Sequence, residues 1–150
     1  MPESLRPTLP QLVLAFDFGL RRIGVACGDT LSRHASALNG VSVGPNSSPW
    51  EGVHSLIREW QPAFLVVGIP YNVDGTENVM TNAARSFANE LAHRYSLEVR
   101  LVDERYSSLE ASSRLREARA AGIIKRRVVK ADIDAVAACV ILERWFIEGI

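Results

Sequence analysis

The chain has 150 residues, of which 47% are hydrophobic and 23% charged, and its formal net charge is zero. No apolar run approaches the roughly 18–20 residues of a membrane span, and the proline-containing start lacks the apolar segment of a signal peptide. We therefore expect a loose tail over residues 1–11 and one ordinary soluble domain with a buried core over residues 12–150.

The first part of the domain is predicted to form three strands, at residues 12–17, 23–29 and 35–43. The third is interrupted by glycine and is expected at an edge of the sheet. Asp17 ends the first strand, where a carboxylate is held rigidly, although an aspartate there often only caps a turn. Gly24 in the second strand permits a close approach of another backbone segment.

Helices and strands then alternate along the chain, which is the pattern of an α/β layer. The expected elements are helix 50–61, strand 64–69, helix 81–95, strand 97–102, helix 108–121 and a last helix from about 131 to 146. Ser48 and Glu51 have the spacing of a capping box for the first helix. Cys27 and Cys139 lie in apolar runs, which predicts buried thiols in a reducing cytoplasm rather than a disulfide or a metal site.

The dipeptide Asp74-Gly75 follows the continuously apolar strand 64–69. It is a turn signal. Ligands of open α/β sheets bind beyond such strand ends, so a role in a binding site is the alternative.

Positive charge is concentrated in one segment of the chain. Between Arg114 and Lys130 there are seven Lys or Arg residues and one glutamate, so this segment carries +6 and the remainder −6. The asymmetry predicts a basic face on an otherwise acidic body, for an anionic partner. A solvated helix face followed by a charged loop would produce the same pattern.

Three carboxylates stand out by their positions in the predicted sheet. Asp17 ends the first strand, Glu104 follows the last strand, and Asp134 opens the last helix. If they converge, their mutual repulsion raises a pKa unless a cation is present, and Mg²⁺ or Mn²⁺ is the ion that such oxygen ligands prefer. Two such ions about 3.5–4 Å apart can activate water and stabilise the leaving oxygen of a phosphodiester.

Each carboxylate also has a purely structural interpretation. Glu104 could pair with Arg100 or Arg105, and Asp132 or Asp134 could cap a helix. Taken together, their positions favour the metal site.

Four motifs occur in order along the chain. They are Asp17 to Ala26 (DFGLRRIGVA), Gly68-Ile69-Pro70 with Asp74-Gly75, Asp103 to Ser108 (DERYSS) with Glu110-Ala111, and Asp134 with Ala137-Ala138 and Ile141-Leu142. Over residues 12–146 the sequence thereby resembles the YqgF/RuvX family of Holliday-junction-resolvase-like bacterial nucleases.

This resemblance implies a ribonuclease H-like α/β fold. Its mixed five-stranded sheet would have three antiparallel strands, then helix-linked parallel strands, with helices on both faces. It also implies a cytoplasmic nuclease with a divalent-metal site, assigned to maturing the 5′ end of pre-16S ribosomal RNA or, in an older proposal, to cleaving Holliday junctions. By motif, Asp17, Glu104 and Asp134 match the catalytic, metal-binding positions, with Asp132 as a rival for the third.

The leading hypothesis is a metal-dependent phosphodiesterase acting on structured nucleic acid, with pre-16S RNA favoured over branched DNA. The residues expected to position phosphates without reading bases are Arg21, Arg22, Lys125, Arg126, Arg127 and Lys130. A homodimer would suit a symmetric junction.

Two alternatives stay open at this point. One is a non-catalytic RNA-binding factor in ribosome assembly. The other is an actin-like phosphotransferase, suggested by Asp17 and Gly19, although that class needs two lobes to enclose a nucleotide.

Overall fold

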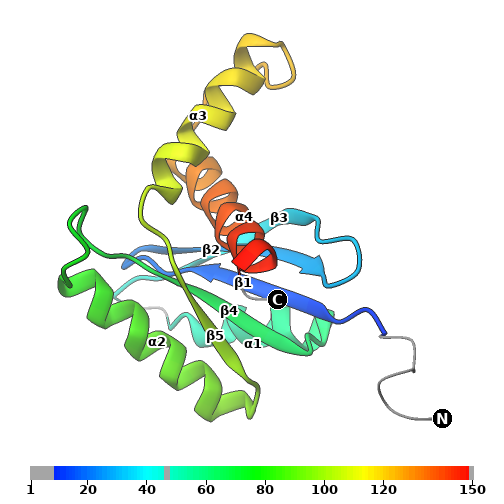
Figure 1. Ribbon diagram of the computed structural model, residues 1–150, viewed down its shortest axis with the longest axis vertical. Helices are drawn as coiled ribbons and strands as arrows, with labels where there is room; N and C mark the ends of the chain where they lie inside the picture. The colour runs from blue at the N-terminus through cyan, green and yellow to red at the C-terminus, as the bar shows by residue number, and fades with distance from the viewer. Residues whose placement is uncertain (1–8, 46–47, 149–150) are drawn as a thin grey trace.

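The computed structural model describes residues 9–45 and 48–148 and is built around one five-stranded sheet (Figure 1). Its elements are β1 (Leu12–Asp17), β2 (Arg22–Asp29), β3 (Ala35–Ser42), α1 (Trp50–Trp60), β4 (Phe64–Ile69), α2 (Val79–Tyr95), β5 (Val99–Asp103), α3 (Ser107–Ala120) and α4 (Lys130–Glu148). The predicted order of strands and helices is confirmed, and each bound lies within two residues of the predicted one.

The strands lie in the order β3-β2-β1-β4-β5. β1, β2 and β3 pair antiparallel, whereas β1, β4 and β5 run parallel. The predicted mixed sheet is therefore confirmed. Because parallel strands end at the same edge, the ends of β1 and β5 point to one side of the sheet on either side of β4.

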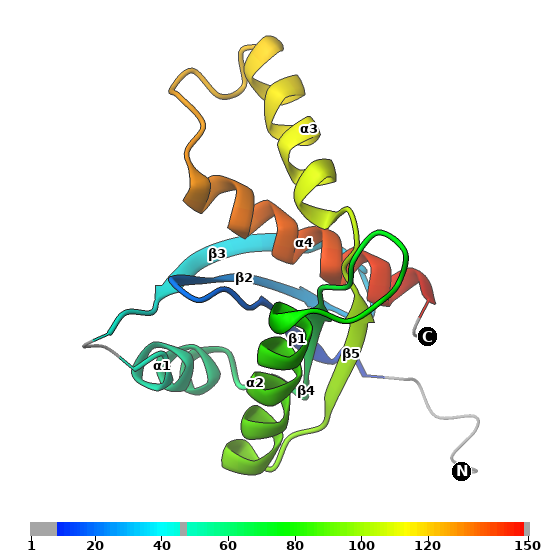
Figure 2. The same cartoon turned by 90° about the vertical axis from the view of Figure 1, so that its left-hand side faces the viewer.

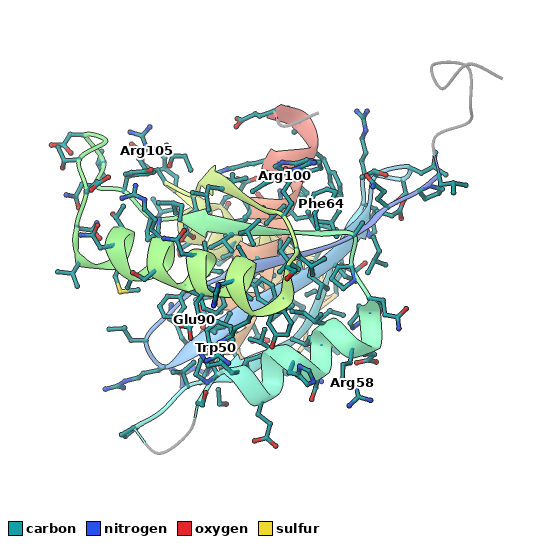
Figure 3. The ribbon with its side chains drawn as sticks, turned by 90° about the horizontal axis from the view of Figure 1, so that it is seen from below. Trp50, Arg58, Phe64, Glu90, Arg100 and Arg105 are labelled. Carbon is teal, nitrogen blue, oxygen red and sulfur yellow. The ribbon has the colours of Figure 1, made fainter. Side chains whose placement is uncertain are left out.

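Helices cover both faces of the sheet. α4 packs across β1, β2 and β3 on one face, and α1 and α2 cover the other (Figures 2 and 3). Strand residues alternate between the two cores, so that Val13 and Ala15 face α4 while Leu14 and Phe16 face the opposite helices. The central strands β1 and β4 are buried on both faces, which explains why β4 is continuously apolar.

On the α1 and α2 face, Phe87 of α2 stacks against Trp50 of α1 with ring centroids 5.4 Å apart, and the guanidinium of Arg94 lies over the Trp50 ring.

Cys139 is buried and Cys27 is partly buried. Within residues 9–45 and 48–148, none of the helices has the length and apolar character needed to cross a bilayer. The predicted tail falls largely on residues 1–8, which lie outside the described residues.

The predicted capping box of α1 is wrong. Pro49 occupies the N-cap position and makes no side-chain capping bond, so Ser48 lies one residue too early and only accepts the N–H of Trp50. The capping box occurs instead at α2, where Asn78 and Thr81 bond to each other's backbone N–H groups.

α3 differs from the other helices because it projects from the body (Figures 1 and 2). It is anchored by Ser107, Ala111 and Leu115, which are buried, whereas no residue from 116 to 133 is buried. We call residues 107–129, which comprise α3 and the connector to α4, the arm.

Candidate active site

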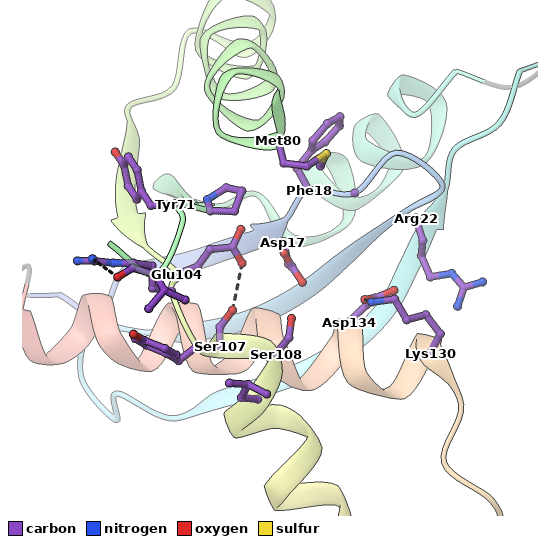
Figure 4. Close-up of a pocket in the computed structure, with 16 residues that line it drawn as sticks. Asp17, Phe18, Arg22, Tyr71, Met80, Glu104, Ser107, Ser108, Lys130 and Asp134 are labelled. Carbon is purple, nitrogen blue, oxygen red and sulfur yellow. Dashed lines mark hydrogen bonds and ion pairs between the residues drawn. The ribbon is translucent and has the colours of Figure 1, made fainter. Parts of the chain in front are cut away.

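A cleft of about 500 Å³ opens where β1, β4 and β5 end (Figure 4). Asp17, Glu104 and Asp134 all line it, so the structure brings the three predicted carboxylates together. β1 supplies Asp17, the residue after β5 supplies Glu104, and the second turn of α4 supplies Asp134. This edge of the sheet is where α/β proteins bind ligands.

Asp17 and Glu104 form the buried centre of the cleft. Only 7% of Glu104 is exposed. Burial raises the pKa of Glu104, and the negative charge of Asp17 raises it further. Burial also raises the pKa of Asp17, a hydrogen bond from Glu104 opposes this, and Asp134 raises it again. The pair therefore retains a proton that isolated carboxyl groups would release, with Glu104 donating to Asp17.

Asp134 reaches the cleft because α4 lies directly against β2. A side chain at Gly24 would overlap the carbonyl oxygen of Asp134, which confirms the close approach expected at this glycine. Asp134 is 9% exposed, and its Oδ1 lies 3.1 Å from Nζ of the exposed Lys130. Lys130 thus supplies the positive charge nearest to this carboxylate.

Asp132 lies outside the cleft. It pairs with Arg126 at 2.6 Å and accepts the backbone N–H of Val129, in the manner of a residue in the first turn of a helix. These interactions, the bond from Arg126 first, lower the pKa of Asp132 to about 2. Of the two rival aspartates, only Asp134 faces the other carboxylates.

The suggested ion pairs of Glu104 with neighbouring arginines are wrong. Arg105 binds Asp103 at 2.8 Å, and Arg100 binds Glu98 at 3.0 Å. Each arginine bonds to the acidic residue two positions earlier, although Arg105 also lines the cleft.

Sequence reasoning missed the residues that hold Glu104 in place. Ser107 is buried, and its hydroxyl donates to Glu104 Oε2 at 3.1 Å. Arg144 of α4 donates to the carbonyl oxygens of Asp103 and Arg105 at 3.2 and 2.8 Å, which ties the two residues flanking Glu104 to the helix. The serine could have been found from its position three residues after Glu104, whereas nothing in the sequence marks the arginine.

The turn interpretation of Asp74-Gly75 is confirmed. Asp74 accepts bonds from the backbone and hydroxyl of Thr76, and Gly75 has a φ of +89°. Neither residue lines the cleft, but the loop that they shape carries Tyr71, which does.

The predicted phosphate-binding residues fall into two groups. Arg22 and Lys130 line the cleft, and both also line an adjoining hollow of about 510 Å³. The remaining predicted residues, Arg21, Lys125, Arg126 and Arg127, are exposed. Arg126 and Lys130 are already engaged in ion pairs, whereas the other four make none within residues 9–45 and 48–148.

The described part of the chain contains no group of three or more His, Cys, Asp or Glu side chains arranged to hold a metal ion. Asp17 and Glu104 bond to each other, while Asp134 bonds to Lys130. The donor chemistry is nevertheless that of a hard cation site, because it offers carboxylate oxygens whose burial and repulsion a divalent ion would relieve.

The chain matches the protein-family model described as RuvX, Holliday junction resolvase, over residues 11–148. A protein of Xylella fastidiosa (strain M23) named "Putative pre-16S rRNA nuclease" is 46% identical over 145 residues, covering 97% of this chain and 93% of the relative. A protein of Edwardsiella ictaluri with the same name is 42% identical over 137 residues, covering 91% and 95%.

Solved structures of resolvases share the fold. Thermus thermophilus RuvC in complex with a Holliday junction substrate matches with a TM-score of 0.55 and 16% identity, covering 90% of this chain and 93% of RuvC. The fowlpox virus resolvase in complex with Holliday junction DNA matches with a TM-score of 0.56 and 9% identity, covering 92% and 97%. The predicted ribonuclease H-like architecture is thus confirmed.

Proposed function

We propose, on the premise that this chain belongs to the RuvX family of Holliday junction resolvase-like nucleases, that it hydrolyses phosphodiester bonds in structured RNA and processes the 5′ end of pre-16S ribosomal RNA. The observation that carries the proposal is the buried pair Asp17 and Glu104 in a cleft beside Asp134. Burial raises the pKa of both carboxyl groups, and carboxyl groups with perturbed pKa values in a cleft cluster at functional sites.

Asp17, Glu104 and Asp134 would hold Mg²⁺ or Mn²⁺, with two ions as the expected number. When bound, such ions supply Lewis-acid polarisation of the phosphodiester and a more acidic attacking water. The chain's own contribution is to release the proton shared by Asp17 and Glu104 and to keep both carboxylates oriented. Ser107 does the latter through its bond to Glu104.

The rim of the cleft supplies the contacts that phosphates need. Arg22 and Lys130 lie on this rim and continue into the adjoining hollow. Arg22 makes no ion pair in the described chain, and the exposed Lys130 pairs with Asp134, so both would contact phosphates next to the bond to be cut. Such contacts position the strand without reading its sequence.

The arm extends this basic surface. It begins at Ser107 and ends just before Lys130, and both of these residues line the cleft. With 14 residues, α3 is about 20 Å long, so its far end lies well beyond one nucleotide. The arm residues that make no ion pair in the described chain are Arg116, Arg119, Lys125 and Arg127. They would contact phosphates of a structured segment next to the cleft and make binding salt-dependent.

Branched DNA is the second candidate substrate, because the family model is described as a Holliday junction resolvase and junction-bound resolvases share the fold. A homodimer would supply two cuts on such a junction and stays a prediction, as does location in the cytoplasm.

The test is a cleavage assay on a 5′-extended pre-16S RNA fragment and on a synthetic four-way DNA junction, with Mg²⁺ or Mn²⁺. The Asp17→Asn variant should lose activity, whereas Asp132→Asn, a carboxylate outside the cleft, should retain it. Equal cleavage by wild type and Asp17→Asn would overturn the proposed function. Cleavage of the junction but not of the RNA would show that branched DNA, rather than RNA, is the substrate.

A further inference from the structure

The cleft has two chemically different sides. Arg22 and Lys130 occupy one side next to Asp134, while Phe18, Tyr71 and Met80 gather on another, near the Asp17 and Glu104 carboxylates (Figure 4). The proposed phosphate contacts involve only the side that carries Arg22 and Lys130. The apolar side has no part in the chemistry described so far.

The apolar side is built as a rigid platform. Phe18 stacks on Phe87 of the core, with centroids 4.8 Å apart and an interplanar angle of 20°. Tyr71 packs partly against the same core, and its hydroxyl accepts a bond from Arg85 at 3.4 Å. The loop behind it is braced where the Thr81 hydroxyl donates to the carbonyl of Pro70. The aromatic groups are therefore held in place before any ligand arrives.

Other apolar side chains that line the cleft are exposed to solvent. Val73 is 74% exposed, and Tyr106 and Leu109 are largely exposed too. Isolated exposed apolar residues need no explanation, but several around one cleft mark a binding site. A cavity of about 500 Å³ lies within the range of roughly 300–1,000 Å³ typical of small-molecule sites.

We infer that Phe18, Tyr71 and Met80 bind one unpaired nucleobase of the strand whose phosphate lies at the carboxylates. The inference rests on the proposed function for the position of that phosphate. A nucleotide fits both sides of the cleft. Its anionic phosphate would contact Arg22 and Lys130, and its flat base would contact the aromatic and apolar side chains. Aromatic and apolar side chains accept any base, because every base has a π-face.

The inference restricts the substrate. A base inside a duplex is paired and stacked and cannot reach side chains that line a cleft unless it leaves the helix. The nucleotide beside the cut is therefore single-stranded or flipped out, whereas the basic arm contacts a structured segment nearby. Cleavage should occur at a junction, bulge or single-stranded extension rather than within continuous duplex.

The test measures binding without cleavage, in the presence of EDTA, by fluorescence polarisation. The two probes are a labelled twelve-nucleotide strand of thymidine and an abasic strand of equal length and charge. Wild type should prefer the strand with bases at least about fivefold, in line with one stacked base. Met80→Ala combined with Tyr71→Ala should reduce this preference below about twofold.

Val79→Ala is the matched control, because Val79 precedes Met80, is 80% exposed and does not line the cleft. It should keep the full preference. Arg22→Gln should weaken both strands equally and leave the ratio unchanged, since phosphate contacts do not read bases. Equal binding of the two strands by wild type would overturn the inference, as would an unchanged preference in the Met80 and Tyr71 variant.

The experiment separates this inference from the proposed function. If the protein prefers the strand with bases but cuts neither substrate, the base-binding inference is supported and the nuclease proposal is contradicted. If it cuts in an Asp17-dependent manner but binds both strands equally, the nuclease proposal is supported and the base-binding inference is contradicted.

Discussion

The cleft carboxylates and the arm are neighbours in the structure, because Ser107 both bonds to Glu104 and begins the arm. The two regions are nevertheless held in opposite ways. Asp17 and Glu104 sit at the ends of β1 and β5, whose neighbours in the sheet are buried on both faces. The arm leaves the body at Ser107, is anchored through Leu115, and has no buried residue beyond it before Asp134. One region is held by the core, and the other is held mainly at its base.

This difference separates the groups that would act on the reacting bond from the groups that would attract the nucleic acid. Groups that must stay oriented at the reacting bond gain from a rigid strand end, whose position the whole core determines. Groups that attract an anion act over a distance and need charge and reach more than fixed geometry. Substitutions in the two regions should accordingly change different measured quantities.

The largest effect should come from Glu104→Gln. It keeps the shape of the side chain and its bond with Ser107 but removes the negative charge. Cleavage should fall at least about a hundredfold, while affinity for the RNA in EDTA changes less than about threefold. A parallel loss of cleavage and affinity would show that the carboxylates do not act separately from the binding surface.

Gly24→Ala should affect the cleft through the fold. The added Cβ would overlap the Asp134 backbone, so α4 must move away from β2. We expect a loss of at least about 2 kcal/mol in unfolding free energy, measured with urea, together with lower activity. Gly122→Ala in the arm is the control for activity, because a Cβ there meets nothing within 4 Å and only the backbone φ of +78° is strained. Normal stability of Gly24→Ala would contradict the described contact between α4 and β2.

Neutralising the positive charges of the arm should weaken nucleic-acid binding. Replacing Arg116, Arg119, Lys125 and Arg127 by Gln removes four charges that make no ion pair in the described chain. Affinity should fall about tenfold at moderate salt, and the slope of log affinity against log salt should become shallower by about 3. Cleavage of bound substrate in a single turnover should be unchanged.

The control for the arm is the pair Arg33→Gln and Arg58→Gln, which removes two charges and is compared with the arm variant per charge removed. Neither arginine makes an ion pair in the described chain, and Arg58 lies on α1, on the opposite face of the sheet from α4 (Figure 3). If these changes weaken RNA binding as much per charge removed as the arm substitutions do, binding depends on the overall charge of the protein and the arm has no special role.

The sequence predicted the two regions unequally, for physical reasons. Strand ends follow from local patterns, so Asp17 and Glu104 could be placed correctly, and parallel topology then brought them together. Whether a charge is free depends on contacts far along the chain. Arg114, counted in the basic segment, is bound to Glu143 at 2.7 Å. Arg144 and Tyr71 were missed because their roles arise only where α4 and the loop after β4 meet the cleft.

A smaller effect should appear in the pH dependence of stability. The folded-state pKa values of Asp17 and Glu104 are raised, so the metal-free native state binds protons more tightly than the unfolded chain. Their contribution to stability is therefore present in acid and lost as the pH rises through these raised pKa values. Relative to wild type, Asp17→Asn should gain stability as the pH rises, by at least about 1 kcal/mol near pH 8.

The measurement is thermal or urea unfolding in EDTA at about pH 5 and pH 8. Other carboxylates, whose pKa values are lowered, act in the opposite direction in both proteins and cancel in the difference. Added Mg²⁺ should stabilise wild type more at the higher pH and Asp17→Asn little. A difference that shrinks with rising pH would mean that these carboxyl groups are not destabilised by their burial.

The smallest effect should come from Asp132→Ala, which separates the two neighbouring aspartates of α4. Asp132 bonds to an exposed arginine and to the Val129 N–H at the start of the helix. Its loss should cost about 1 kcal/mol in unfolding free energy, because an ion pair to an exposed arginine contributes little and a bond at a helix start contributes about that much. Cleavage should stay within about twofold of wild type, whereas Asp134→Asn, two residues later and facing the cleft, should lose most of it. If Asp132→Ala abolished cleavage and Asp134→Asn did not, the connector that carries Arg126 would have to fold inward on substrate binding, and the arm would belong to the catalytic cleft rather than to capture.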